Sequence, residues 1–343
     1  MLISSLIRQG KQDAWLMPWW AGTFGMAVSL VWVLLYRYYP GQSLAQIPVS
    51  VLGRPLGMAV SLLFFVYFCL VGGWVLRDLS DFLNGTIMPR TPPTVFHAMF
   101  LFVVGYTVAQ GVETIARLNQ FITSFLFFPF WSVLILALSE WDWERIQPIL
   151  RTDIGETMIR NHYFLGFPYL ETLVMMMFLP HLENKAGRSF VIGIGTASLS
   201  LSVILFMITG LLGVERASNL TYPIYTVVQE IMYGGKTINI HSVISVVLLI
   251  LIFIKLLVLV YGAYECLNQL FQPAVKWPFF IVLGMILCAL ALTIYDNPIQ
   301  DLEWGLQYNF IFYSMFAIVL PVMLLMVTWI KAAIQKKKGM TRK

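Results

Sequence analysis

Charged residues are scarce in this chain of 343 residues. Asp, Glu, Lys and Arg make up 11% of it, apolar residues make up 59%, and the mean hydropathy is +0.79. Soluble domains carry about 25% charged residues, so the composition excludes an ordinary water-soluble domain. Because the apolar residues form continuous runs and do not alternate with polar ones, they predict an all-α integral membrane protein.

Cysteine and histidine are also few. Cys69, Cys266 and Cys288 all lie in or beside apolar runs, which argues against a disulfide framework. The four histidines are scattered without metal-ligand spacing. No nucleophile stands with a base in a recognisable pattern. We therefore expect neither a cofactor nor an enzyme, and the net charge of +5 does not indicate nucleic-acid binding because much of it sits in one tail.

The apolar runs predict a single transmembrane domain over 1–343 with no soluble domain. Each run approaches the roughly 20 residues that a bilayer core requires. Trp and Tyr gather near the ends of the runs, as is typical of membrane interfaces. Nine spans are predicted, at about 14–36, 56–76, 94–112, 121–138, 162–180, 189–212, 243–265, 277–295 and 305–330.

The two ends of the chain differ in character. The C-terminal segment 331–343, KAAIQKKKGMTRK, holds six of the 22 basic residues and reads as a cytoplasmic tail beside anionic lipid. The N-terminal MLISSLI is too short to span a membrane or to act as a signal peptide. It resembles the last turns of a helix, so residues 1–13 are interpreted as the remnant of a first helix and its link.

One apolar run, Asn161–Leu182, is interrupted by Gly166, Phe167 and Pro168 and carries Glu171 three residues later. Proline removes a backbone donor, and in lipid the freed groups must be satisfied by protein or by a polar cavity. A carboxylate at that depth is costly and indicates a functional site. The alternative is a Pro-kinked structural helix whose Glu bonds a neighbouring helix.

Several motifs follow one another in a fixed order along the chain. They are GKQDAW (Gly10–Trp15), RPLG (Arg54–Gly57), LRDLSDFL with MPRTP (Leu76–Leu83 and Met88–Pro92), GVETIAR (Gly111–Arg117) and FPYLETLVMMMFLPHL (Phe167–Leu182). In their order and spacing the chain resembles the spore germination permease family. Its members are the B subunits of Ger-type nutrient germinant receptors, within the amino acid/polyamine/organocation transporter superfamily.

The resemblance implies a transporter-type bundle of ten helices in two inverted repeats. In this fold the broken first and sixth helices line a central site. It also implies a small-molecule germinant, with an amino acid expected, an A subunit and a C-subunit lipoprotein as partners, and a place in the spore inner membrane. Two features depart from the family. Leu170 stands where the family has glycine, and the first helix is reduced to a stub.

Eight residues are candidate ligand contacts. Freed backbone groups and the end of a half-helix at the break suit the carboxylate or amine of an amino acid. Glu171 and Lys255 lie at similar depth, so they can form a salt bridge, and Lys255 can supply a fixed cation. Tyr67 and Tyr261 offer hydroxyls, although packing is the commoner role of such residues. The full set is Gly166, Phe167, Pro168, Tyr169, Glu171, Lys255, Tyr67 and Tyr261.

Two further groups of charged residues stand close together in the sequence. Arg77, Asp78 and Asp81 lie near the outer end of the second span, where they form either a gate or, more simply, a solvated cluster. Glu113 and Arg117 are four apart and face each other on a helix.

Three functions follow from these features. The first is a receptor subunit that binds a small nutrient and signals germination. The second is a secondary transporter of amino acids or amines. The third is an inactive truncated fragment, suggested by the reduced first helix.

We predict that the C-terminus is cytoplasmic, because the basic tail decides the orientation under the positive-inside rule. Fusions of alkaline phosphatase and of a fluorescent protein after Lys343 measure this directly. The fluorescent fusion should be bright and the phosphatase fusion inactive. An active phosphatase fusion would contradict the orientation.

Overall fold

The computed structural model describes residues 2–150, 154–182, 186–229, 232–233, 236–237, 241–272 and 277–340. Within these ranges the chain is almost entirely helical, which confirms the all-α membrane fold. A small antiparallel pair, β1 (Met232–Tyr233) and β2 (Lys236–Thr237), sets Met232 opposite Thr237. Of the two terminal segments discussed above, Met1 and residues 341–343 lie outside the described residues.

The helices follow one another through short links. The α-helices are α1 (Leu2–Gly10), α2 (Met17–Tyr38), α3 (Ile47–Leu52), α4 (Arg54–Thr86), α5 (Pro93–Ala109), α6 (Val112–Ala137), α7 (Ile154–Arg160), α8 (Ala186–Leu212), α9 (Val214–Asn219), α10 (Pro223–Gln229), α11 (His241–Phe271), α12 (Trp277–Thr293), α13 (Pro298–Ser314) and α14 (Leu320–Met340). Short 3-10 segments are Lys11–Leu16, Leu138–Glu140, Trp143–Arg145, Leu170–Met177 and Leu179–His181, and π-helical turns are Leu165–Tyr169 and Met315–Val319.

Six helical stretches in the described ranges are long and apolar enough to cross a membrane, which makes this a multi-pass membrane protein. They are Leu2–Tyr38, Arg54–Thr86, Val112–Glu140, Ala186–Leu212, Ser242–Phe271 and Pro298–Gln335. Three shorter apolar helices are Pro93–Ala109, Leu165–Met177 and Trp277–Thr293. Every predicted span overlaps one of these segments. Three of them fall short of about 20 residues, so the count of nine spans stays a prediction.

Local sequence explains where the helices start. Proline occupies the first turn of α2, α4, α5 and α13, where its missing N–H costs nothing. The side chain of Asn297 accepts hydrogen bonds from the N–H groups of Ile299 and Gln300 and so caps α13. Gly53 and Gly111 precede α4 and α6 with φ of +83° and +98°. Such angles favour glycine, so each residue fixes the sharp entry to its helix.

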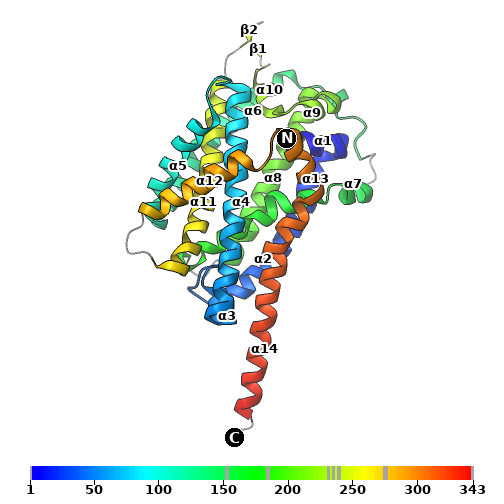
Figure 1. The fold of residues 1–343 in the computed structure, drawn as a ribbon. Coiled ribbons are helices and arrows are strands. Elements are labelled where there is room, and N and C mark those ends of the chain that lie inside the picture. The colour runs from blue at the N-terminus through cyan, green and yellow to red at the C-terminus, as the bar shows by residue number, and fades with distance from the viewer. Residues whose placement is uncertain are drawn as a thin grey trace.

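Helix α4 lies at the centre of the bundle, packed against α11, α12, α3 and α5. Figure 1 shows it running through the middle of the molecule, with α14 projecting beyond the bundle to the C-terminus. On the other side α2 packs against α8 and α14, and α13 packs against the π-helical turn Leu165–Tyr169. The interrupted segment is therefore held between the two groups of helices.

Gly166 sets the distance between the interrupted segment and α13. A Cβ placed on it would lie 2.9 Å from the carbonyl oxygen of Asn309 and 3.1 Å from the Cα of Phe310. Both atoms belong to the backbone of α13, which cannot rotate away as a side chain can. Only glycine allows this approach.

We predict that Gly166→Ala lowers stability by about 1–3 kcal/mol, because the added methyl overpacks against backbone. Thermal unfolding of the purified protein in detergent should show a lower Tm. The matched control is Gly284→Ala in α12, where an added Cβ meets no atom within 4 Å. The control should be neutral or slightly more stable, since alanine favours helix. An unchanged Tm for Gly166→Ala would contradict the close approach.

Candidate functional site

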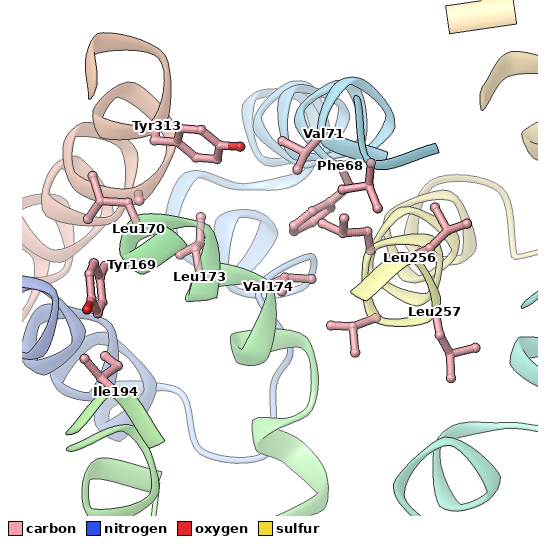
Figure 2. Close-up of a cluster of buried hydrophobic side chains, with 14 of the residues drawn as sticks. Phe68, Val71, Tyr169, Leu170, Leu173, Val174, Ile194, Leu256, Leu257 and Tyr313 are labelled. Atoms are coloured by element: carbon pink, nitrogen blue, oxygen red, sulfur yellow. The ribbon is translucent and has the colours of Figure 1, made fainter. Parts of the chain in front are cut away.

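The interrupted segment is a broken helix, as the sequence predicted. Phe167 has φ −112° and ψ 128°, which is not helical, inside the π-helical turn that precedes the 3-10 segment Leu170–Met177. Beyond the break the side chains point in different directions. In Figure 2, Tyr169 lies on the side of Ile194, Leu170 lies toward the helix of Tyr313, and Val174 faces α4 and α11. The broken segment thus contacts several helices at once.

Glu171 and Lys255 form an ion pair across this segment and α11. Lys255 Nζ lies 2.9 Å from Glu171 Oε2, so the salt bridge that the sequence allowed is present. The same ammonium stands 4.1 Å from the centre of the Phe167 ring, a cation–π distance. We call these three residues the ammonium cluster. It joins the break, the buried acid of Glu171 and the partly buried amine of Lys255.

Two polar atoms beside the cluster are buried and have no hydrogen-bond partner in the described part of the chain. They are the second carboxylate oxygen of Glu171, Oε1, and the hydroxyl of Tyr67. The ring of Tyr67 stacks on Phe316 with centroids 4.7 Å apart. An unsatisfied buried polar atom costs about 1–3 kcal/mol, so such atoms usually meet a water or a ligand.

A cavity of about 330 Å³ opens beside the ammonium cluster, between α4, α11 and α13. Phe167 and Lys255 line one part of it. Asp78 and Asp81 of α4 and Asp301 of α13 line another part. The remaining wall is mostly apolar and aromatic, and includes Val71, Trp74, Ile252, Trp304, Leu306 and Tyr313.

The acidic wall is fixed by a network around Arg77. Its guanidinium bonds Asp81 at 3.1 Å and stands 4.8 Å from the centre of the Tyr295 ring. The Tyr295 hydroxyl donates to Asp81 at 3.0 Å and, more weakly, to Asp78 at 3.4 Å. Burial, and then the neighbouring carboxylates, raise the pKa of Tyr295, so its hydroxyl keeps the proton that it donates.

Only some of the eight predicted site residues reach the cavity. Phe167 and Lys255 line the cavity, and Glu171 is 6% exposed behind them. Gly166 and Pro168 form the break itself.

The three tyrosines of this set are buried in packing contacts. The Tyr169 hydroxyl donates to the Pro18 carbonyl at 2.9 Å and accepts from Ser198 at 3.0 Å, which ties the break to α2 and α8. Tyr261 packs on Phe178 with ring centroids 4.6 Å apart. Neither these two nor Tyr67 is among the residues that line the cavity.

The sequence analysis did not predict the part of the cavity wall that α13 supplies. Asp301 lies in the first turn of that helix, and its only signal was an acid close to an apolar run. Asp78 and Asp81 belong to the cavity wall, which the reading of a simple solvated cluster did not anticipate. Glu113 and Arg117 do pair, at 2.6 Å, but their side chains are 76% and 78% exposed, so the pair contributes little.

We predict that Glu171 and Lys255 are energetically coupled. Removing one partner leaves the other charge buried, and breaking such pairs costs roughly 3–5 kcal/mol in soluble proteins. Since the Lys255 side chain is 32% exposed to the cavity, the cost here should fall at the lower end of that range. A double-mutant cycle with Glu171→Gln and Lys255→Met, read as Tm in detergent, measures the coupling.

The double variant should unfold at a higher temperature than the sum of the two single effects predicts. Strictly additive effects would show that the pair does not interact. If Lys255→Met instead retains its Tm and loses ligand response, the amine acts as a built-in cation and not as a structural partner.

The chain is similar to known proteins along most of its length. The family described as spore germination protein matches residues 1–300. Spore germination protein KB of Bacillus subtilis (strain 168) is 23% identical over 348 aligned residues, covering 98% of this chain and 93% of that protein. Spore germination protein B2 of the same organism is 23% identical over 344, covering 98% and 90%. YndE is 21% identical over 277, covering 80% and 75%.

These matches run through the motif segments and the broken helix. The identities are low, but the coverage is nearly complete in both directions for the first two relatives. The resemblance read from the motifs is thereby confirmed. This multi-pass membrane protein belongs to the spore germination protein family, whose members are permease-like.

Proposed function

We propose that this protein is the membrane subunit of a spore germinant receptor, which binds a small nutrient, an amino acid, and signals germination. Membership of the spore germination protein family supports a role in germination. The observation that carries the proposal is the position of Phe167 and Lys255 on the wall of a cavity of about 330 Å³. Ligand pockets range from about 300 to 1,000 Å³, so this one suits a small molecule.

A ligand in that cavity can act directly on the contacts that hold the broken segment. Its carboxylate would meet the ammonium of Lys255, whose other contacts are Glu171 at 2.9 Å and the Phe167 ring at 4.1 Å. Competition for this ammonium weakens the bridge between the broken segment and α11. A ligand can shift a conformational equilibrium only by binding its two states differently. The ion pair supplies such a difference.

Membership of the spore germination protein family supports a proposal for the partners. We propose that an A subunit and a C-subunit lipoprotein receive the signal, and that the complex lies in the spore inner membrane. The protein would then convert occupancy of the cavity into a movement of the broken segment. Its contacts with α2, α11 and α13 carry that movement to the surface of the bundle.

A second candidate is secondary transport of amino acids or amines. Broken helices beside a central cavity are how several transporters build their substrate sites, and that likeness favours this function. Uptake of radiolabelled amino acids into proteoliposomes separates the two candidates. Ligand binding without flux supports the receptor, and saturable flux supports the transporter.

We predict that Glu171→Gln abolishes the response of spores to nutrient at near-normal protein level. Glutamine keeps the shape of the side chain and removes the charge that holds Lys255. Loss of absorbance of a spore suspension, recorded against the concentration of each of the twenty amino acids, measures the response.

The control is Glu303→Gln, which removes an exposed acid on α13 that does not line the cavity. Spores with this variant should respond normally. A normal dose–response in Glu171→Gln spores would remove Glu171 from the site.

A further inference from the structure

We propose that the hydroxyl of Tyr67 is a second partner for the carboxylate of Glu171, which turns to it when Lys255 engages another anion. The broken segment is then held to α4 by this hydrogen bond instead of to α11 by the ion pair. Release of Lys255 by a nutrient rests on the proposed function, whereas the exchange of partners at Glu171 does not. Tyr67 thereby becomes a positioning residue, not the ligand contact that the sequence indicated.

Both groups are buried, and each has an unused hydrogen-bonding atom. Glu171 bonds Lys255 through Oε2 at 2.9 Å, while its Oε1 has no partner among the described residues. The Tyr67 hydroxyl has no partner there either. Glu171 is 6% exposed and Tyr67 is fully buried, so bulk water serves neither atom. Because a carboxylate accepts hydrogen bonds and a phenol donates one, the two atoms are complementary.

The two groups already influence each other. The charge of Glu171 acts on the Tyr67 hydroxyl across the space between the broken segment and α4. A glutamate side chain has several rotatable bonds, so its carboxylate can turn while its backbone stays in place. Turning away breaks the ion pair, so the change becomes favourable only when the ammonium of Lys255 has another anion to bind.

Aromatic packing fixes the position of the Tyr67 ring. The ring stacks on Phe316 with centroids 4.7 Å apart and meets Tyr313 edge-on at 6.0 Å. Phe312 lies at 5.8 Å and Phe68 at 5.2 Å. A ring held by neighbours from α4, α13 and the following π-helical turn cannot swing out to solvent. The hydroxyl is therefore a stationary donor, and the carboxylate is the part that moves.

The neighbouring Tyr313 suits this role less well. Its hydroxyl points from α13 toward α4 (Figure 2), and its side chain lines the cavity. It is therefore open to whatever enters the cavity. Tyr67 does not line the cavity, and the charged residue that acts on its hydroxyl in the described part of the chain is Glu171. A buried donor that faces a single acid is selective for that acid.

The test uses the full chain, purified in detergent, and needs no nutrient. Tyr67→Phe keeps the ring and removes the hydroxyl. In the otherwise unchanged protein it should leave Tm unchanged or raise it slightly, because the hydroxyl makes no hydrogen bond there. In a Lys255→Met background the same substitution should lower Tm, because the hydroxyl is then the remaining partner of Glu171.

Two other tyrosines serve as controls. Tyr169→Phe removes a hydroxyl that is bonded to Pro18 and Ser198, so it should lower Tm equally in both backgrounds. Tyr313→Phe should show no coupling to Lys255→Met. If Lys255→Met does not accumulate in the membrane, Lys255→Gln takes its place with the same expected result.

Equal effects of Tyr67→Phe in the two backgrounds would overturn the inference. Coupling of Lys255→Met to Tyr313→Phe, and not to Tyr67→Phe, would overturn it as well.

Spores show whether signalling uses the exchange of partners. Loss of absorbance gives the half-maximal concentration of whichever of the twenty amino acids acts most strongly on spores with the unchanged protein. Tyr67→Phe should raise this concentration at least about tenfold at equal protein level, because the activated conformation loses a hydrogen bond to a charged group. A hydroxyl with a merely structural role would instead lower Tm and leave the concentration unchanged, which would overturn the inference.

The two experiments separate this inference from the proposed function. Spores with the unchanged protein that respond to none of the twenty amino acids would count against the proposed function. The Tm measurements would still decide whether Glu171 exchanges Lys255 for Tyr67, because they depend on the purified protein alone.

Discussion

The ion pair between Glu171 and Lys255 is the contact on which the arrangement of the site depends. A helix broken in a membrane exposes backbone groups that lipid cannot satisfy, so the break must be enclosed by protein. The pair does this by joining the segment after the break to α11 at 2.9 Å. The same ammonium holds the Phe167 ring at 4.1 Å, so the break, the acid and the cavity wall share one contact. A change in the contacts of Lys255 therefore affects the break, the acid and the cavity wall together.

Some polar atoms around the ion pair lack a hydrogen-bond partner in the described part of the chain. One Glu171 oxygen and the Tyr67 hydroxyl are buried without a partner among the described residues. Buried polar groups of this kind lower stability and are retained where they serve a site. Both groups lie beside the ammonium cluster, so the energetic cost is concentrated there. The fold holds this arrangement through the packing of α4 against α11 and of α13 against the π-helical turn Leu165–Tyr169.

Much of the site could be predicted from sequence because it depends on local chemistry. Proline inside an apolar run removes a backbone donor, so a break at Pro168 could be expected, and two charges deep in apolar runs have few partners other than each other. The acidic wall could not be predicted in this way, because Asp78 and Asp301 are more than two hundred positions apart and meet only through the packing of α13 beside α4. The direction in which a tyrosine side chain points also depends on tertiary packing. Tyr169 turned toward Pro18 and Ser198, and nothing in its own segment indicated it.

The fixed ammonium also bears on how binding energy is used under the proposed function. A transporter that couples to a dissociable ion spends part of its ligand-binding energy on loading and releasing that ion. Lys255 is covalently part of α11 and cannot leave, so no ion gradient is drawn on when its partner changes from Glu171 to a ligand carboxylate. The free energy of binding then remains in the conformation of the broken segment. Because an equilibrium shift equals the difference in affinity between two states, that conformational change is the output of the site. A receptor requires such a conformational change as its signal, whereas a coupled transporter must use the change to move solute.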